Sequence, residues 1–424
     1  MAFERSRIPK GIVAMMVVGL TLACRDNGTQ APSLVFLSPE SGQSQSAWPG
    51  RTLSDDLVVR TVGSDGGPVA GVTISWSTGE GGSFDPPTST TGTDGLAATQ
   101  WTLGRSATAQ VAVATAEDLT ASFPASVTLT GSWVSVAELP HPVAAAAVTT
   151  DGSRIYVFGG EGGTGVRTAY TQVFDPASGA WTTGADVPKA TSWSTAVFVD
   201  GKLHLLGGVT DQAAAIAEHW IYDPSANSWT SGPSLPSAAA GAASGVVGSD
   251  VFVVGGIDGP GAYSAHTRVY DLPGSEWSSK ADAPASRINW QGAAIGGKLY
   301  IAGGSSAGRI TNTALLAYDP GTDAWSSLAP IPKATEGYAG TDADGVYCVL
   351  GGRVTPTSGS YGEPFDLLAC FVPEMHSWLD GPSLPIAVEE GGAASVHGVL
   401  YLIGGRVGPA EVTGSVYRLD GSGS

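Results

Sequence analysis

The sequence predicts an all-β chain with two domains, and three observations support this. Short runs of alternating apolar and polar residues, separated by turn-forming clusters, fill the chain after residue 33, and no long stretch has the 3.6-residue apolar period of a helix. A glycine pair follows an apolar run six times in the second part of the chain, and tryptophans recur in step with it. A length of 424 residues suits two or three domains.

The charge balance limits the partners that we expect. The chain has 20 Lys and Arg against 38 Asp and Glu, which gives a formal net charge of −18. A surface with this excess of negative charge repels nucleic acid and anionic lipid headgroups. We therefore expect no nucleic-acid partner, and contact with a membrane only through a lipid anchor. We also expect a monomer.

Residues 1–23 have the pattern of an export signal. Three basic residues precede an apolar stretch from Ile12 to Ala23, which is too short to cross a bilayer because a span needs about 20 residues. The stretch ends at Cys24 and resembles the lipobox of bacterial lipoproteins, although Thr21 stands where Leu is commonest. The resemblance implies cleavage before Cys24, lipidation of that residue, residues 24–32 as a tether, and a place in the bacterial cell envelope, in the periplasm or at the outer membrane or cell surface. The alternative is a plain secretion signal with a chance cysteine.

Residues 33–130 have the pattern of a β-sandwich without the glycine repeat. Five alternating runs follow one another at residues 57–62, 71–78, 96–103, 109–116 and 121–129, with turn clusters between them. Trp76 alternates with Val72 and Ile74, so we expect it in the core. The pieces "GGPVAGVTISW" and "TDGLAATQWTLG" resemble bacterial Ig-like modules of the invasin and intimin type, which implies a stalk or adhesive arm.

Residues 131–420 consist of six repeats, followed by a tail at 421–424. The first glycine of each pair stands at 159, 207, 255, 303, 351 and 404, and a tryptophan lies 26 residues before each of them, at 133, 181, 229, 277, 325 and 378. Repeats of about 50 residues with four short strands are typical of the blades of a β-propeller. The domain begins with a lone fourth strand and ends with three strands, so we expect the first strand to complete the sixth blade and close the ring.

The glycine pairs, the "YDP" turns and the spaced tryptophans together resemble the kelch repeat in all six copies, with departures at "FVP" in the fifth and "YRL" in the sixth. Most kelch propellers bind other molecules, and a minority are enzymes, notably galactose oxidase relatives and N-acetylneuraminate epimerases. The resemblance alone does not choose between binding and catalysis. Our first hypothesis is a non-catalytic binding protein for a protein or carbohydrate ligand.

Sequence variation predicts where such a ligand binds. It is concentrated in the loops between the second and third strands of a blade and between the fourth strand and the next blade, which share one face of a propeller. Aromatic rings can stack on a sugar or peptide there, and charged groups can form hydrogen bonds. The alternative is that these side chains are only solvated. The candidate ligand-binding residues are Trp193, Arg287, Asn289, Trp290, Glu336, Tyr338, Arg353, Tyr361, Glu389, Glu390 and Arg406.

A second hypothesis is sugar mutarotation or epimerisation, which needs a proton donor and acceptor at one carbon. Its candidates are Glu336 and Glu389 with Arg287 or Arg353. A copper oxidase needs two tyrosines, two histidines and a cysteine bonded to a ring. The six histidines are scattered singly along the chain and the cysteines fall on strands. We therefore expect no metal and no cofactor.

Cys348 and Cys370 fall on strands of the fifth repeat that we expect to be hairpin neighbours. If they lie directly opposite each other, they can form a disulfide in an oxidising compartment. The alternative is a pair of buried free thiols.

Overall fold

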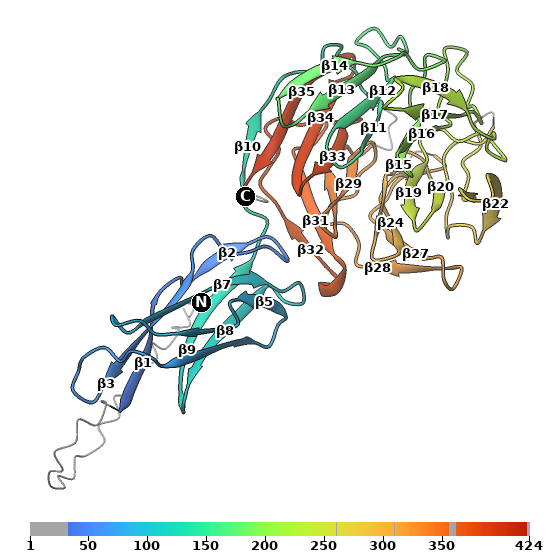
Figure 1. Ribbon diagram of the computed structural model, residues 1–424. Coiled ribbons are helices and arrows are strands. Elements are labelled where there is room, and N and C mark those ends of the chain that lie inside the picture. The colour runs from blue at the N-terminus through green and yellow to red at the C-terminus, as the bar shows by residue number, and fades with distance from the viewer. Residues whose placement is uncertain (1–32, 260, 309, 356–361, 422–424) are drawn as a thin grey trace, which may run out of the picture.

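The protein is described by a computed structural model that covers residues 33–259, 261–308, 310–355 and 362–421 (Figure 1). The predicted signal segment and tether, residues 1–32, lie outside the described residues, as does Tyr361. The described part is all-β, as predicted, with one 3₁₀ turn at Pro373–Met375. No helix in that part could span a membrane.

The first domain is built from two sheets that pack face to face. One sheet has the order β1 (Leu34–Ser41), β3 (Leu57–Gly63), β7 (Leu96–Leu103) and β5 (Gly82–Asp85). The other has the order β2 (Gln45–Ala47), β9 (Leu119–Val127), β8 (Ala109–Ala116), β4 (Thr73–Thr78) and β6 (Thr88–Thr90). Trp76, Trp101 and Phe123 are buried in the shared core, since alternate residues of each strand point inward. Trp76 therefore lies where the sequence predicted.

The second domain is a ring of six four-stranded antiparallel sheets, which are the six predicted blades. Blade 1 consists of β11 (Ala147–Thr150), β12 (Ile155–Phe158), β13 (Thr171–Asp175) and β14 (Ala180–Thr183). Blade 2 consists of β15 (Thr195–Val199), β16 (Lys202–Leu206), β17 (His219–Asp223) and β18 (Ser228–Ser231). Blade 3 consists of β19 (Ala243–Val247), β20 (Asp250–Val254), β21 (Thr267–Asp271) and β22 (Glu276–Lys280). Blade 4 consists of β23 (Gly292–Ile295), β24 (Lys298–Ala302), β27 (Leu315–Asp319) and β28 (Ala324–Leu328). Blade 5 consists of β29 (Ala339–Ala343), β30 (Val346–Leu350), β31 (Leu368–Val372) and β32 (Ser377–Asp380). Blade 6 consists of β33 (Gly392–Val396), β34 (Val399–Gly408) and β35 (Glu411–Asp420), together with β10 (Ser132–Ser135) from the start of the domain. A small hairpin, β25 (Ser305–Ser306) with β26 (Ile310–Thr311), follows β24.

The predicted closure of the ring is confirmed. The lone strand β10 pairs antiparallel with β35, with Trp133 opposite Leu419, so the start of the domain completes blade 6 (Figure 1). This arrangement joins the two ends of the domain through backbone hydrogen bonds.

The recurring tryptophans connect neighbouring blades. In each blade the indole N–H on the outer strand donates to a backbone carbonyl of the preceding blade, as from Trp181 to Ala137 at 2.8 Å and from Trp229 to Ala185 at 2.9 Å. Trp133 donates in the same way to Pro382 of blade 5, at 3.1 Å. The spacing of the tryptophans in the sequence therefore reflects one hydrogen bond repeated at every blade boundary.

The glycine pairs are required by close backbone approach. At Gly207 the backbone has a φ of +62°, and an added Cβ would overlap the carbonyl oxygen of Ala239 in the following blade. Only glycine combines this left-handed conformation with this close contact.

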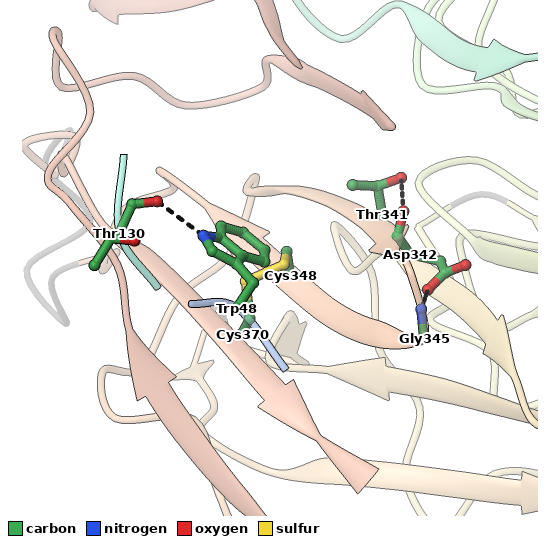
Figure 2. Close-up of a disulfide and its surroundings, with 7 residues drawn as sticks. All are labelled: Trp48, Thr130, Thr341, Asp342, Gly345, Cys348 and Cys370. Carbon is green, nitrogen blue, oxygen red and sulfur yellow. Dashed lines mark hydrogen bonds between the residues drawn. A yellow bond between two sulfur atoms is a disulfide. The ribbon is translucent and has the colours of Figure 1, made fainter. Parts of the chain in front are cut away.

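The sandwich contacts the propeller at blade 5. The indole N–H of Trp48 donates to the carbonyl of Thr130 at 2.8 Å, and its ring packs beside the disulfide that joins Cys348 on β30 to Cys370 on β31 (Figure 2). Arg51 forms an ion pair with Asp344 in the turn between β29 and β30. This turn joins the first and second strands of its blade. It belongs to the face opposite the loops predicted to bind a ligand.

Candidate functional site

The loops that enter each blade meet at the propeller axis in a ring of backbone hydrogen bonds, which we call the axial ring. Its six members occupy equivalent positions in the six repeats, and all have a positive φ between 51° and 62°. Each N–H donates to the carbonyl of the preceding member at 2.5–3.0 Å, and Ala145 N–H closes the circle on Glu390 at 2.8 Å. The members are Ala145, Trp193, Gly241, Asn289, Gly337 and Glu390.

The axial ring separates two cavities. On the side of the inner strands a cavity of about 250 Å³ is lined by the first strand of every blade. On the loop side lies a cavity of about 310 Å³, which we call the mouth, and a cavity of about 40 Å³ lies at the ring itself. The mouth is lined by Trp193, Ile257, Tyr263, Ile288, Asn289, Ser305, Glu336, Arg353 and Glu390. Five of these nine were candidates from the sequence.

A second set of equivalent positions decides the chemistry of the mouth. In every blade the residue after the glycine pair forms a β-bridge with the residue that precedes the axial ring. In blades 1, 5 and 6 these bridges bring charged side chains to the loop face, as in Glu336 with Arg353 and Glu389 with Arg406. In blades 2 to 4 they bring apolar or small ones, such as Ile257 and Ile288. One half of the loop face is therefore charged at these positions and the other half is largely apolar.

The charged half contains two linked groups of ion pairs. In the first, Arg353 lies between two buried carboxylates, with Nη1 2.8 Å from Glu389 Oε1 and Nε 3.6 Å from Glu336 Oε1. Thr355 adds a hydroxyl donor to Glu336. Charges this deeply buried are stable only when paired, so the group is held in one arrangement.

In the second group, Arg406 bridges Glu390 and Glu161, at 3.2 Å to each. Arg167 then pairs with Glu161 at 3.3 Å. Burial raises the pKa of Glu390, and Arg406 opposes this effect. Burial alone would lower the pKa of Arg406, but the carboxylates of Glu390 and Glu161 raise it overall.

Five described candidates do not line the mouth. Glu389 and Arg406 belong to the ion pairs beside it, whereas Trp290, Tyr338 and Arg287 are buried in the scaffold, which corrects their predicted placement. Trp290 and Tyr338 are each 1% exposed and pack in the core between blades. The indole of Trp290 donates to Val254 at 3.2 Å, and the hydroxyl of Tyr338 donates to Ala302 at 2.6 Å. Arg287 is 7% exposed and donates to the carbonyl of Gly303 at 2.9 Å. Each of these three flanks the axial ring in sequence, but its side chain supports the scaffold.

Residues that sequence reasoning missed complete the site. Glu161 occupies the same repeat position as Arg353 and Arg406, directly after a glycine pair, so the repeat register could have identified it. Ile257 occupies that position too, but an apolar residue there carries no signal of a site. Tyr263 comes from the loop after β20 and lines the mouth opposite the charged half.

The loops around the mouth also present apolar tips. Val166 and Ile310 are each 60% exposed and Val354 is 37% exposed, and they come from the equivalent loops of blades 1, 4 and 5. These three apolar side chains therefore lie on the same face of the propeller as the mouth.

Two histidines that are isolated in the sequence form a pair in the fold. His204 on β16 and His219 on β17 are both buried, and their ring nitrogens lie 2.8 Å apart. Burial lowers the pKa of each to about 4. The pair lies between blades 2 and 3, away from the mouth. Across the described residues, no three His, Cys, Asp or Glu side chains are grouped so that they could hold a metal ion.

The geometry defines a class of protein, a closed six-bladed β-propeller with a ligand-sized cavity on its axis. Residues 127–280 match the KLHDC2/KLHL20/DRC7 Kelch-repeats domain, and residues 292–332 match the Kelch motif. The solved structure of YjhT is similar, with a TM-score of 0.59 at 17% sequence identity, and the match covers 66% of this chain and 95% of that one. The fold is therefore a kelch-type β-propeller. The comparison with curated proteins gave no match, and the Ig-like assignment of residues 33–130 stays a prediction.

Proposed function

We propose that the protein is a non-catalytic binding protein that holds a protein or carbohydrate ligand in the mouth of its propeller. The observation that carries the proposal is the presence of two unlike walls around one cavity of about 310 Å³. The wall from blades 2 to 4 offers apolar and aromatic surface, with Trp193, Ile257 and Tyr263. The wall from blades 5 and 6 offers oriented charges. Ligand sites combine these two features, because apolar contact supplies affinity and a few polar groups fix orientation.

The exposed loop tips support a ligand that extends beyond the mouth. Val166 and Ile310 are exposed on loops of the same face, and a glycan chain or a polypeptide segment is long enough to contact both the cavity and these loops. The hypothesis of an epimerase needs Glu336 and Glu389 as proton-transfer groups, but both carboxylates are directed to Arg353. Binding without turnover accounts better for a mouth whose charges are paired with one another.

We also propose an exported lipoprotein, anchored through Cys24, whose Ig-like arm carries the propeller. The arm contacts the face that holds Asp344, so the mouth on the other face is left open to a ligand. The disulfide between Cys348 and Cys370 suits an oxidising compartment. Metabolic labelling with palmitate tests the anchor: the wild type should be labelled and Cys24→Ala should not, and equal labelling of both would refute it.

The binding proposal is tested by neutralising one group of charges as a unit. The variant Glu336→Gln/Arg353→Met/Glu389→Gln removes all three charges together, which leaves no unpaired buried charge to unfold the protein. The matched control is Lys298→Met/Asp319→Asn, which removes an ion pair of 3.0 Å on the opposite face.

Both variants and the wild type are screened by calorimetry against neutral, acidic and amino sugars and against short peptides. We expect the ligand of the wild type to bind the control unchanged and to bind the neutralised variant at least about tenfold more weakly, since a charged hydrogen bond contributes about 1.5–3 kcal/mol. Equal binding to all three proteins, or turnover of a bound sugar, would refute the proposal.

A further inference from the structure

The axial ring alternates small and large side chains around the propeller axis. Blades 1, 3 and 5 contribute Ala145, Gly241 and Gly337, whereas blades 2, 4 and 6 contribute Trp193, Asn289 and Glu390. The three large side chains are therefore spaced by about a third of a turn. All three line both the mouth and the small cavity of about 40 Å³ at the ring. They form a triad of an indole, an amide and a carboxylate around one point of the fold.

The backbone conformation accounts for Asn289 but not for Trp193 or Glu390. Each has a positive φ, 58° at Trp193, 55° at Asn289 and 52° at Glu390. Glycine and asparagine adopt this conformation readily, but a bulky residue such as tryptophan is strained in it. Since the hydrogen bonds of the ring use only backbone atoms, glycine at all six positions would build the same ring with less strain. Strained backbone of this kind is typical of functional sites.

The surroundings leave the triad available to a ligand. The indole of Trp193 lies against Gly241, where an added Cβ would be 3.3 Å from its Cε3 atom, so the small neighbour makes room for the ring. Glu390 uses Oε2 for Arg406 at 3.2 Å. Within the described part of the chain, Glu390 Oε1, Trp193 Nε1 and the amide of Asn289 have no hydrogen-bond partner.

We propose that Trp193, Asn289 and Glu390 form a binding site for a primary ammonium group. The inference rests on the proposed function of the mouth as a ligand site and names the chemistry that the site selects. A primary ammonium has three N–H donors. The carboxylate of Glu390 and the amide oxygen of Asn289 accept two of them, and the indole face of Trp193 attracts the positive charge.

Size and polarity favour this group over other ligands. A compact ammonium fits a cavity of about 40 Å³ and can direct its donors separately to Glu390 and Asn289, whereas the rigid planar fork of a guanidinium suits a single bidentate acceptor. An alkyl or sugar body can then occupy the mouth beside Ile257 and Ile288. Anionic ligands are disfavoured, because Arg353 and Arg406 already pair with carboxylates.

Two amine probes test the site, one for each source of the ammonium. Nα-acetyl-lysine N-methylamide represents a lysine side chain, and glucosamine represents an amino sugar. Their neutral counterparts are the Nε-acetylated lysine compound and N-acetylglucosamine. We expect one amine to bind the wild type in calorimetry and its acetylated form to bind at least about tenfold more weakly, since a charged hydrogen bond is lost.

Single variants then locate the bound amine. Glu390→Gln should weaken the amine at least about tenfold, and Trp193→Phe should weaken it less than Trp193→Ala because phenylalanine keeps an aromatic face. The control is Glu276→Gln, which removes the same charge from the exposed strand β22 and should change nothing. Thermal melts check that every variant is folded.

The outcome separates this inference from the proposed function. If neither amine binds, if acetylation has no effect, or if Glu390→Gln binds like the wild type, the ammonium site is wrong. The broader proposal still stands if another ligand binds the mouth and is lost on neutralising Glu336, Arg353 and Glu389. If no ligand requires Glu336, Arg353 and Glu389 for binding, both the broader proposal and the ammonium site are wrong.

Discussion

The buried pair of His204 and His219 should make the propeller lose stability in mild acid. The two ring nitrogens lie 2.8 Å apart, and His219 also contacts the carbonyl of Pro233 at 3.1 Å. Burial lowers the pKa of both to about 4, against 6.5 for an exposed imidazole. The folded protein thus binds fewer protons than the unfolded chain below pH 6.5. The contribution of the uncharged pair to the free energy of unfolding is fully present above pH 6.5 and is lost as the pH falls toward 4.

The magnitude follows from the two pKa values. Between pH 7.5 and pH 5.0, a histidine whose pKa falls from 6.5 to 4 on folding loses about 2 kcal/mol of stability. The loss is therefore about 2 kcal/mol if one ring governs the titration and about 4 kcal/mol if both do. The perturbation is His204→Leu/His219→Phe, which removes both titrating groups and keeps an apolar contact with Tyr270 and Trp277 in the next blade.

The assay is urea denaturation followed by tryptophan fluorescence at pH 7.5 and pH 5.0. The control is the substitution His266→Gln, which replaces an exposed histidine whose Nδ1 lies 3.1 Å from Asp258. We expect the wild type and the control to lose about 2–4 kcal/mol more than the double variant between the two pH values, because the other titrating groups contribute equally and cancel. If the double variant loses as much as the wild type, the pair is not the origin of the acid sensitivity.

Two further predictions concern the scaffold. Gly207→Ala should destabilise the protein by about 1–3 kcal/mol more than Gly201→Ala, because both residues have a positive φ but only at Gly207 would the new Cβ meet a backbone carbonyl. Chemical denaturation of both variants checks this, and equal losses would contradict it. Replacing Cys348 and Cys370 by alanine should cost about 3 kcal/mol, since the disulfide closes a loop with a sequence separation of 22. A midpoint of denaturation that is unchanged relative to the non-reduced wild type would exclude this contribution.

The repeat allowed most of the propeller to be predicted, because its signals are local and periodic. A glycine pair and a tryptophan each mark one contact that recurs at every blade boundary, so their spacing gave both the number of blades and the closure by β10. The opposition of Cys348 and Cys370 follows from the same strand order, since they are direct partners in the register of β30 and β31.

The direction of side chains in the loops could not be predicted in this way. Asn289 and Trp290 are adjacent in sequence, yet the first lines the mouth and the second is buried in the core. The positive φ at Asn289 sends the two side chains in different directions. Asparagine is common in loops of every conformation, so its presence in the sequence does not predict this φ. The pairing of His204 with His219 depends likewise on a diagonal contact across β16 and β17, which appears only once the register is known.

The separation of scaffold from site explains how one repeat can carry a specific ligand site. The axial ring and the β-bridges beside it are made by backbone atoms, so they place no demand on the side chains at Trp193, Asn289 or Glu390 beyond tolerance of a positive φ. The glycine pairs and interblade tryptophans hold the six blades in position without using those residues. Ligand chemistry can therefore change at the axis by single substitutions while the scaffold stays the same. For this reason the chemistry of the mouth follows from individual loop residues, although the repeat specifies where the mouth lies.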